Sequence, residues 1–216
     1  SIIKNQISIS EVKELKIFVS LNNLFSLKGI IVKDVILKEA NFNFNNTNFN
    51  FFLKLLGNNF SEKTLKVKNS NIFYRNSENE VLFINKIKKM EYSYDQNNLT
   101  NIAYSENEIF NIPYSYQLIN NEIDKKIFSK VNLFFLKLQI ENEIDYNYDI
   151  KKGSVDFIYN QNKSNAKYEF NKDFFIFNFL DNSIKPSFVY DGKFNFNPFH
   201  SSIEGKTDKL TLSTLF

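Results

Sequence analysis

Hydrophobic and polar side chains alternate with a period of two along most of the chain. Residues 166–170, 175–179 and 90–94 each place an aromatic, Ala or Met side chain at every second position, with polar or other residues between. Such alternation puts one set of side chains on one face of a β-strand and the other set on the opposite face. It is typical of antiparallel strands that keep one face in water. The pattern therefore predicts an all-β, mainly antiparallel protein.

Short stretches rich in Asn, Asp or Gly separate the alternating runs, as at 95–98, 120–121, 160–162 and 191–192. These residues tolerate the backbone conformations that turns require. The runs between the turns are long, which favours an extended sheet over a compact sandwich. We expect strands near residues 3–9, 12–20, 30–45, 63–76, 81–95, 99–112, 114–122, 127–144, 152–161, 164–171, 173–180, 186–197 and 207–213.

One segment departs from this alternation. Residues 47–57 place Phe49, Phe52, Leu53 and Leu56 at the spacing of one helical face. Thr47 can cap the start of a helix, and Gly57 stands where helices commonly end. We therefore expect one short helix near 47–57. Because no linker or composition shift is visible, residues 1–216 are interpreted as one segment without an internal domain boundary.

The composition narrows the possible chemistry. The chain contains 25 Phe and 11 Tyr, enough apolar surface to build a folded domain. It has no Cys, which excludes disulfides, Cys-ligated metals and a thiol nucleophile. The net charge of +3 and a single arginine, Arg75, argue against a nucleic-acid partner. No apolar run approaches the roughly 20 residues that cross a bilayer.

Three features are candidate sites, and each is interpreted as structural. His200 is the only histidine, and the Pro198 that precedes it favours a loop position without a catalytic partner. Asp145, Asn147 and Asp149 resemble the start of a calcium loop but are followed by Ile150, where such a loop needs Gly. Two lysine clusters, at 86–89 and 125–130, are interpreted as solvated or edge-strand lysines rather than contacts with anionic headgroups. We expect no enzyme, no metal and no cofactor.

The apolar strand faces are the most informative feature, because a single helix cannot cover all of them. An apolar face must be buried in some way. The sheet can close on itself, pair with another chain or domain, or form a groove that an apolar ligand occupies. The residues alone leave these three solutions open.

The order of segments nevertheless resembles a known family. An apolar strand at 30–37 leads through 40–44 to the expected helix, then to Leu65-Lys66-Val67-Lys68-Asn69-Ser70-Asn71-Ile72-Phe73-Tyr74, and later to segments 81–87, 109–114 and 190–199. This order is similar to the membrane-proximal part of the AsmA-like family, the TamB-related bacterial proteins of the cell envelope. The resemblance extends over about residues 10–216.

The resemblance implies a non-enzymatic function in phospholipid transport and envelope assembly. Members of the family lie in the periplasm, are anchored in the inner membrane by an N-terminal helix, and form a long sheet whose apolar floor carries lipid. It implies phospholipids as ligands, an anchor outside this chain and envelope protein partners that the sequence does not identify. The resemblance also implies that the sheet is twisted and curved and forms an open hydrophobic groove. Residues 1–216 would be a single β-groove segment of a longer protein.

A β-groove that carries acyl chains needs a floor of apolar side chains on one face. The alternation predicts this floor at Leu136, Leu138, Ile140, Phe157, Tyr159, Tyr168, Phe170, Phe175, Phe177, Phe179, Tyr190, Phe194 and Phe196. An error of one residue in register would move a strand's contribution to the other face. The alternative is a structural or interaction β-domain of the envelope, with a closed core and no lipid.

Overall fold

The structure is a computed structural model that describes residues 2–4, 7–20, 32–45, 48, 64–181 and 188–207. The protein is all-β, and its strands form an open, mostly antiparallel sheet, as the alternation predicts. Within each of the two units described below, strands that pair are also neighbours in the chain. Contacts divide the chain into two compact units, Ser1–Ile119 and Asn120–Phe216, which are described separately below.

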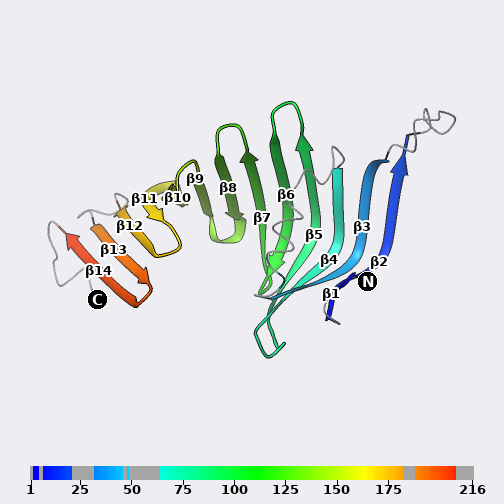
Figure 1. Cartoon of the computed structure of the whole chain (residues 1–216), viewed down its shortest axis with the longest axis horizontal. Helices are drawn as coiled ribbons and strands as arrows, with labels where there is room; N and C mark the ends of the chain where they lie inside the picture. Colours follow the sequence, from blue (N-terminus) through cyan, green and yellow to red (C-terminus); the bar gives the residue numbers. More distant parts are fainter. Residues whose placement is uncertain are drawn as a thin grey trace. The chain divides into compact units, whose positions relative to one another are not determined.

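The first unit contains the short strand β1 (Ile2–Lys4) and the longest strands of the protein. The longer strands are β2 (Ile7–Val19), β3 (Val32–Phe44), β4 (Thr64–Arg75), β5 (Val81–Asp95), β6 (Thr100–Ile109) and β7 (Ile112–Asn121), whose last two residues belong to the second unit (Figure 1). The pair β3–β4 is parallel, whereas β2–β3, β4–β5 and β5–β6 are antiparallel. A parallel pair needs a crossover connection, and residues 45–63 make it. The predicted helix at 47–57 lies outside the described residues, apart from the turn residue Asn48.

The buried face of the first unit changes its parity in the middle of the strands. In β4 the buried residues Val67 and Ser70 are three positions apart, and in β5 Ile87 and Tyr92 are five positions apart. Regular strands repeat a face at even spacings, so each strand must contain one extra residue between these positions. In β6 the buried residues, from Asn101 to Asn107, keep the even spacing.

Three neighbouring residues supply this extra position, and we call them the kink line: Glu39, Asn69 and Lys88. Glu39 and Asn69 have left-handed backbones, with φ of 50° and 49°. They lie side by side, because the register of β3 on β4 runs through Lys38–Lys68 and Asn41–Asn71. Lys88 lies at a register shift between β5 and β6. Bulges of this kind bend a strand, and β3 and β4 curve along their length in Figure 1.

The hydroxyl of Ser70 forms hydrogen bonds with two backbone groups beside the kink line, where the regular strand pairing is interrupted. Its Oγ accepts a hydrogen bond from the Ala40 backbone N–H at 3.0 Å and donates one to the Lys68 carbonyl at 2.9 Å. Ser70 and Ala40 are almost completely buried. A buried N–H without an acceptor would be costly, so this hydroxyl allows the bend to form inside the buried face.

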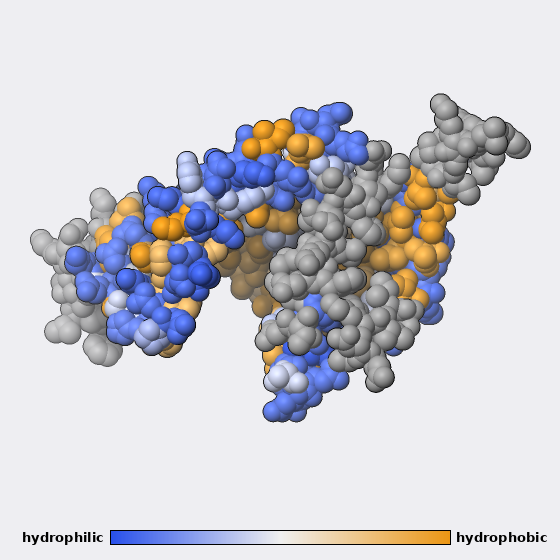
Figure 2. Space-filling model, in the orientation of Figure 1, coloured by the Kyte–Doolittle hydropathy of each residue, from blue (hydrophilic) through white to orange (hydrophobic). Residues whose placement is uncertain are grey.

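Strand β2 of the first unit carries exposed apolar side chains. Leu15 and Ile17 of β2 are 56% and 55% exposed, and Phe18 beside them is also exposed. Figure 2 shows hydrophobic residues as a patch in this region of the molecule. The predicted boundary between strands 3–9 and 12–20 is wrong, because β2 continues through residues 10 and 11.

The second unit contains shorter and more uniform strands. They are β8 (Lys126–Leu133), β9 (Leu138–Asp145), β10 (Lys151–Tyr159), β11 (Asn162–Phe170), β12 (Phe174–Asp181), β13 (Phe188–Phe196) and β14 (Phe199–Thr207), and every pair is antiparallel. A 3-10 turn, η2 (Phe134–Leu136), joins β8 to β9. The strand predicted over 127–144 is therefore two strands. The prediction also misses β14, because it places the last strand at 207–213.

Candidate functional site

Every strand of the second unit contributes apolar side chains to one face of its sheet. Directly paired residues point to the same side of a sheet, so the register of β8–β14 identifies this side. We call it the aromatic face. Its apolar members in the described strands are Ile127, Val131, Leu133, Leu138, Ile140, Ile144, Val155, Phe157, Tyr159, Ala166, Tyr168, Phe170, Phe175, Phe177, Phe179, Tyr190, Phe194, Phe196, Phe199 and Ile203.

Aromatic rings of β10–β13 form two clusters of contacts on this face. The Phe175 ring lies 5.7 Å from the Tyr168 ring, 6.0 Å from the Phe177 ring and 6.3 Å from the Phe194 ring, between centroids. The ring of Phe179 lies 6.2 Å from that of Phe157. Aromatic pairs at these separations attract one another beyond their shared apolar burial. One cluster thus contains Tyr168, Phe170, Phe175, Phe177 and Phe194, and the other contains Phe157, Phe179 and Tyr190.

Glycines make room for the largest rings. Beside Gly153 lies the ring of Tyr168, and beside Gly192 lies the ring of Phe177, each in the space that a side chain on the glycine would occupy. Because the paired residue in the next strand has no side chain, the ring can lie across the strand instead of standing upright. Gly in a strand often marks such a close approach.

The hydroxyl of Tyr168 is a polar group on the aromatic face. Tyr168 reaches across Gly153 and donates a hydrogen bond from its hydroxyl to Asn142 Oδ1. Partial burial raises the pKa of Tyr168 above its usual value, and the hydrogen bond with Asn142 partly offsets this rise. The phenol therefore stays neutral at physiological pH and keeps its proton for Asn142.

The opposite face carries charges in cross-strand pairs, and we call it the polar face. Lys126 lies 2.6 Å from Glu143, Lys130 lies 3.0 Å from Glu141, and Lys163 lies 2.8 Å from Asp156, measured between nitrogen and oxygen atoms. Lys152 pairs with Glu169 in the same way. The two faces therefore differ sharply in chemistry, although each strand contributes to both.

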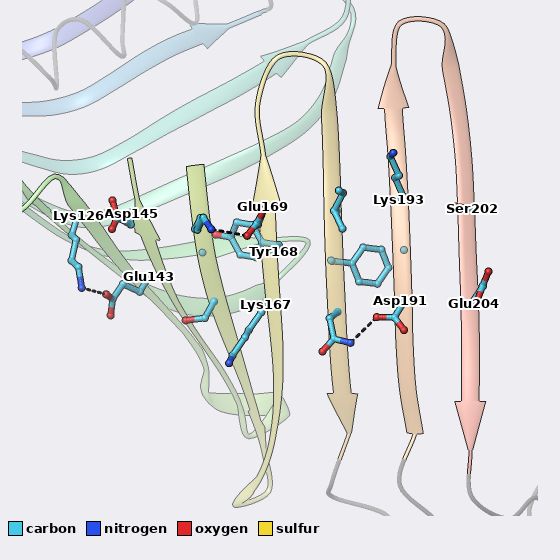
Figure 3. A pocket seen from close by; sticks show the side chains of 17 residues that line it. Lys126, Glu143, Asp145, Lys167, Tyr168, Glu169, Asp191, Lys193, Ser202 and Glu204 are labelled. Carbon is cyan, nitrogen blue, oxygen red and sulfur yellow. Dashed lines mark hydrogen bonds and ion pairs between the residues drawn. The ribbon is translucent and has the colours of Figure 1, made fainter. Parts of the chain in front are cut away.

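A hollow of about 750 Å³ crosses the strands of the second unit. Two register rows of the polar face form its walls. One row runs from Lys126 to Ser202 and the other from Glu143 to Glu204 (Figure 3). Gly153, Tyr168, Phe177 and Gly192 line it between the rows. The walls of the hollow are thus mainly ion-paired and polar side chains, and two of the residues predicted for the acyl-chain floor, Tyr168 and Phe177, also line it.

Nothing among the described strands covers the aromatic face. The strands of the second unit pack extensively only against their neighbours in the sheet. As a result, apolar side chains near the rim of the face remain in contact with solvent: Tyr159 is 62% exposed, Phe196 48%, Phe199 73% and Ile203 61%. In the part of the chain that the structure describes, this face has no second layer.

The register brings together all of the predicted floor residues except Leu136. Leu136 lies in the turn η2 rather than in a strand, so the alternation that links it to Leu138 does not apply to it. The prediction misses Ile127, Val131, Leu133, Ile144, Val155, Ala166, Phe199 and Ile203. Most of these alternate with polar residues as well. Phe199 and Ile203 are missed because their strand is not predicted.

The structure places the other candidate features in strands and turns. His200 lies in β14, opposite Asn195, and not in the predicted loop. The segment that resembles a calcium loop is a turn between β9 and β10, in which Asp145 Oδ1 accepts a hydrogen bond from the Asn147 N–H. Lys86 and Lys88 lie within 4 Å of Glu108. The described residues contain no cluster of acidic, His or Cys side chains that could hold a metal ion.

Comparison with known proteins gives no further assignment. No protein-family model, curated protein or solved structure matches the chain. Within the described residues, no helix has the length and apolar character needed to cross a membrane.

Proposed function

We propose that the chain is a non-enzymatic phospholipid transport or envelope assembly protein that binds acyl chains on the aromatic face of its second unit. The observation that carries the proposal is the uncovered aromatic face itself. It extends over β8–β14, whereas the opposite face of the same sheet carries cross-strand ion pairs on β8–β11. The resemblance to AsmA-like proteins supports the same function, with the chain in the periplasm and an inner-membrane anchor outside it.

The physical basis is the cost of leaving this face in water. Burying an acyl chain gains about 0.8 kcal/mol for each methylene group removed from water. Rings from neighbouring strands give a lipid similar contacts at each step across the face, so no single position holds it tightly. A phospholipid headgroup can remain in water at the rim, where Lys151 lies on the aromatic face beside the Phe170 ring.

The test is mass spectrometry of lipids that remain bound when the protein is purified without detergent. We expect the wild type to retain phospholipid and Phe177→Asp to lose it. The matched control is Ile176→Asp, because Ile176 is the preceding residue of β12, is 38% exposed and belongs to the polar face. This control places the same charge on the same strand, and it should retain lipid.

A second variant separates lost lipid from lost folding. Tyr190 lies on the aromatic face and is 38% exposed, so Tyr190→Asp disturbs packing less than Phe177→Asp. Circular dichroism shows which variants keep their strands. Folded aromatic-face variants without lipid, beside a control with lipid, support the proposal. A stable, lipid-free wild type would overturn it and favour the structural β-domain.

A further inference from the structure

The turn between β8 and β9 exposes three consecutive apolar side chains. Phe134 is 69% exposed, Phe135 is 82% exposed and Leu136 is 40% exposed. We call these three residues the apolar tip. Two large rings at a loop end have no packing role within the described unit, and a contiguous apolar patch commonly marks an interaction site.

The apolar tip has a defined backbone. The Lys137 N–H donates a hydrogen bond to the Phe134 carbonyl at 3.1 Å, which closes the turn, and Lys137 itself has a left-handed backbone with φ of 49°. The Asn160 N–H in the next turn donates to the Lys137 carbonyl, also at 3.1 Å. These two hydrogen bonds fix the backbone of the turn that carries the rings. Binding therefore costs little backbone conformational entropy.

The surroundings of the apolar tip match the interface of a bilayer. Tyr159, at the adjacent strand end, is 62% exposed, and Tyr side chains suit the boundary between hydrocarbon and water. Lys137 follows the tip directly and forms no ion pair within the described chain, so its charge is available to an anionic headgroup. An exposed apolar tip that is followed directly by a lysine is suited to insertion into the interface of a bilayer.

The apolar tip also adjoins the aromatic face. Leu133 and Leu138 pair with each other directly beside the turn, and Leu138 pairs with Tyr159. These residues form the end row of the aromatic face. An apolar path therefore leads from the tip to the proposed acyl-chain surface without crossing the polar face.

We propose that Phe134, Phe135 and Leu136 insert into the interface of a lipid bilayer and place the end of the aromatic face next to it. The placement of the aromatic face next to the bilayer matters only if the proposed function holds. Insertion of the tip is argued from the apolar tip alone. Lipid would then enter the aromatic face beside Leu133 and Leu138, where the tip meets the membrane.

The experiment uses the absence of Trp from this chain. Phe135→Trp introduces a single indole at the apolar tip, and Tyr148→Trp introduces one in the turn at the opposite end of β9. Tyr148 is 69% exposed, so the two probes start in comparable environments. The proteins are mixed with vesicles of equimolar phosphatidylethanolamine and phosphatidylglycerol, with and without lipids brominated on their acyl chains.

We expect the fluorescence of Phe135→Trp to shift to the blue on adding vesicles and to be quenched by the brominated lipids, whereas that of Tyr148→Trp stays unchanged. In a binding assay with the same vesicles, replacing both Phe134 and Phe135 by Ser should weaken partitioning at least about tenfold, because two buried rings are lost. Replacing Tyr148 by Ser should leave partitioning unchanged.

Three results would overturn the proposal: no shift of the probe at position 135, equal shifts of both probes, or unchanged partitioning of the double Ser variant. A shift at position 135 that depends on protein concentration without vesicles would also overturn it, and would assign the tip to a second copy of the chain. Failure of the lipid-retention test in a protein whose tip still inserts would refute the proposed function alone.

Discussion

The ring of Phe177 occupies the space that a side chain at Gly192 would fill. These residues are directly paired between β12 and β13, and a methyl group at position 192 would come within 2.0 Å of the ring. We therefore expect Gly192→Ala to displace the ring and destabilise the protein by about 1–3 kcal/mol, the usual cost of overpacking. Urea unfolding of the purified variant measures this change.

Gly205→Ala provides the matched control for this substitution. A methyl group at position 205 would lie 3.1 Å from the Tyr190 ring, a contact that small adjustments can relieve. Its free energy of unfolding should therefore change much less. A Gly192→Ala protein as stable as the wild type would show that the ring of Phe177 does not depend on the glycine.

The buried hydroxyl of Ser70 gives a second prediction. In Ser70→Ala the backbone N–H of Ala40 loses its acceptor while staying buried, which should cost about 1–3 kcal/mol. Ser93→Ala is the control, because Ser93 is only half-buried. Thermal or urea unfolding compares the two. Equal stability of both variants would mean that the Ala40 N–H finds another partner.

The left-handed backbone of Glu39 gives a third prediction. A non-glycine residue at φ of 50° is strained, and a β-branched residue is strained further. Glu39→Gly should raise the free energy of unfolding by about 0.5–1 kcal/mol, and Glu39→Val should lower it by about 1–2 kcal/mol. Both variants lose the exposed ion pair with Lys13, so this small contribution cancels in the comparison. Equal stabilities would argue against a left-handed requirement.

The alternation assigns side chains to a face more reliably in β10–β13 than in β3–β5, for a physical reason. In β10–β13 the alternation runs without interruption, so a period of two is enough to assign Phe157, Tyr168, Phe177 and Tyr190 to one face. In β3–β5 the kink line moves the buried set by one residue. Asn69 is compatible with a left-handed position, but nothing in its neighbours distinguishes it from the many other Asn residues.

The error at Leu136 has a different origin. The run from Phe128 to Ile140 contains no Gly, Pro or Asn-rich turn, apart from the single Asn132, so local chemistry does not reveal the break at η2. The turn forms because Lys137 adopts the left-handed conformation and its carbonyl accepts a hydrogen bond from Asn160 of the neighbouring turn. Such a long-range hydrogen bond is not visible in the alternation.

The ion pair between Asp156 and Lys163 gives a prediction about pH. The hydrogen bond from Lys163 lowers the pKa of the Asp156 carboxyl below its usual value, and a hydrogen bond from Asn165 adds to this effect. A carboxyl whose pKa is lowered by folding stabilises the protein above its unfolded pKa, and that contribution is lost as pH falls through the folded pKa. The contribution should therefore be complete at neutral pH and disappear at pH values below about 4.

Asp156→Asn isolates this contribution, because it keeps the shape of the side chain and removes its charge. The difference in unfolding free energy between wild type and variant should be largest near neutral pH and shrink toward zero in acid. The raised pKa of Lys163, which comes from its hydrogen bond to Asp156, means that the difference should also fall in strong alkali. A difference that stays constant with pH would show that the two charges do not interact in the folded protein.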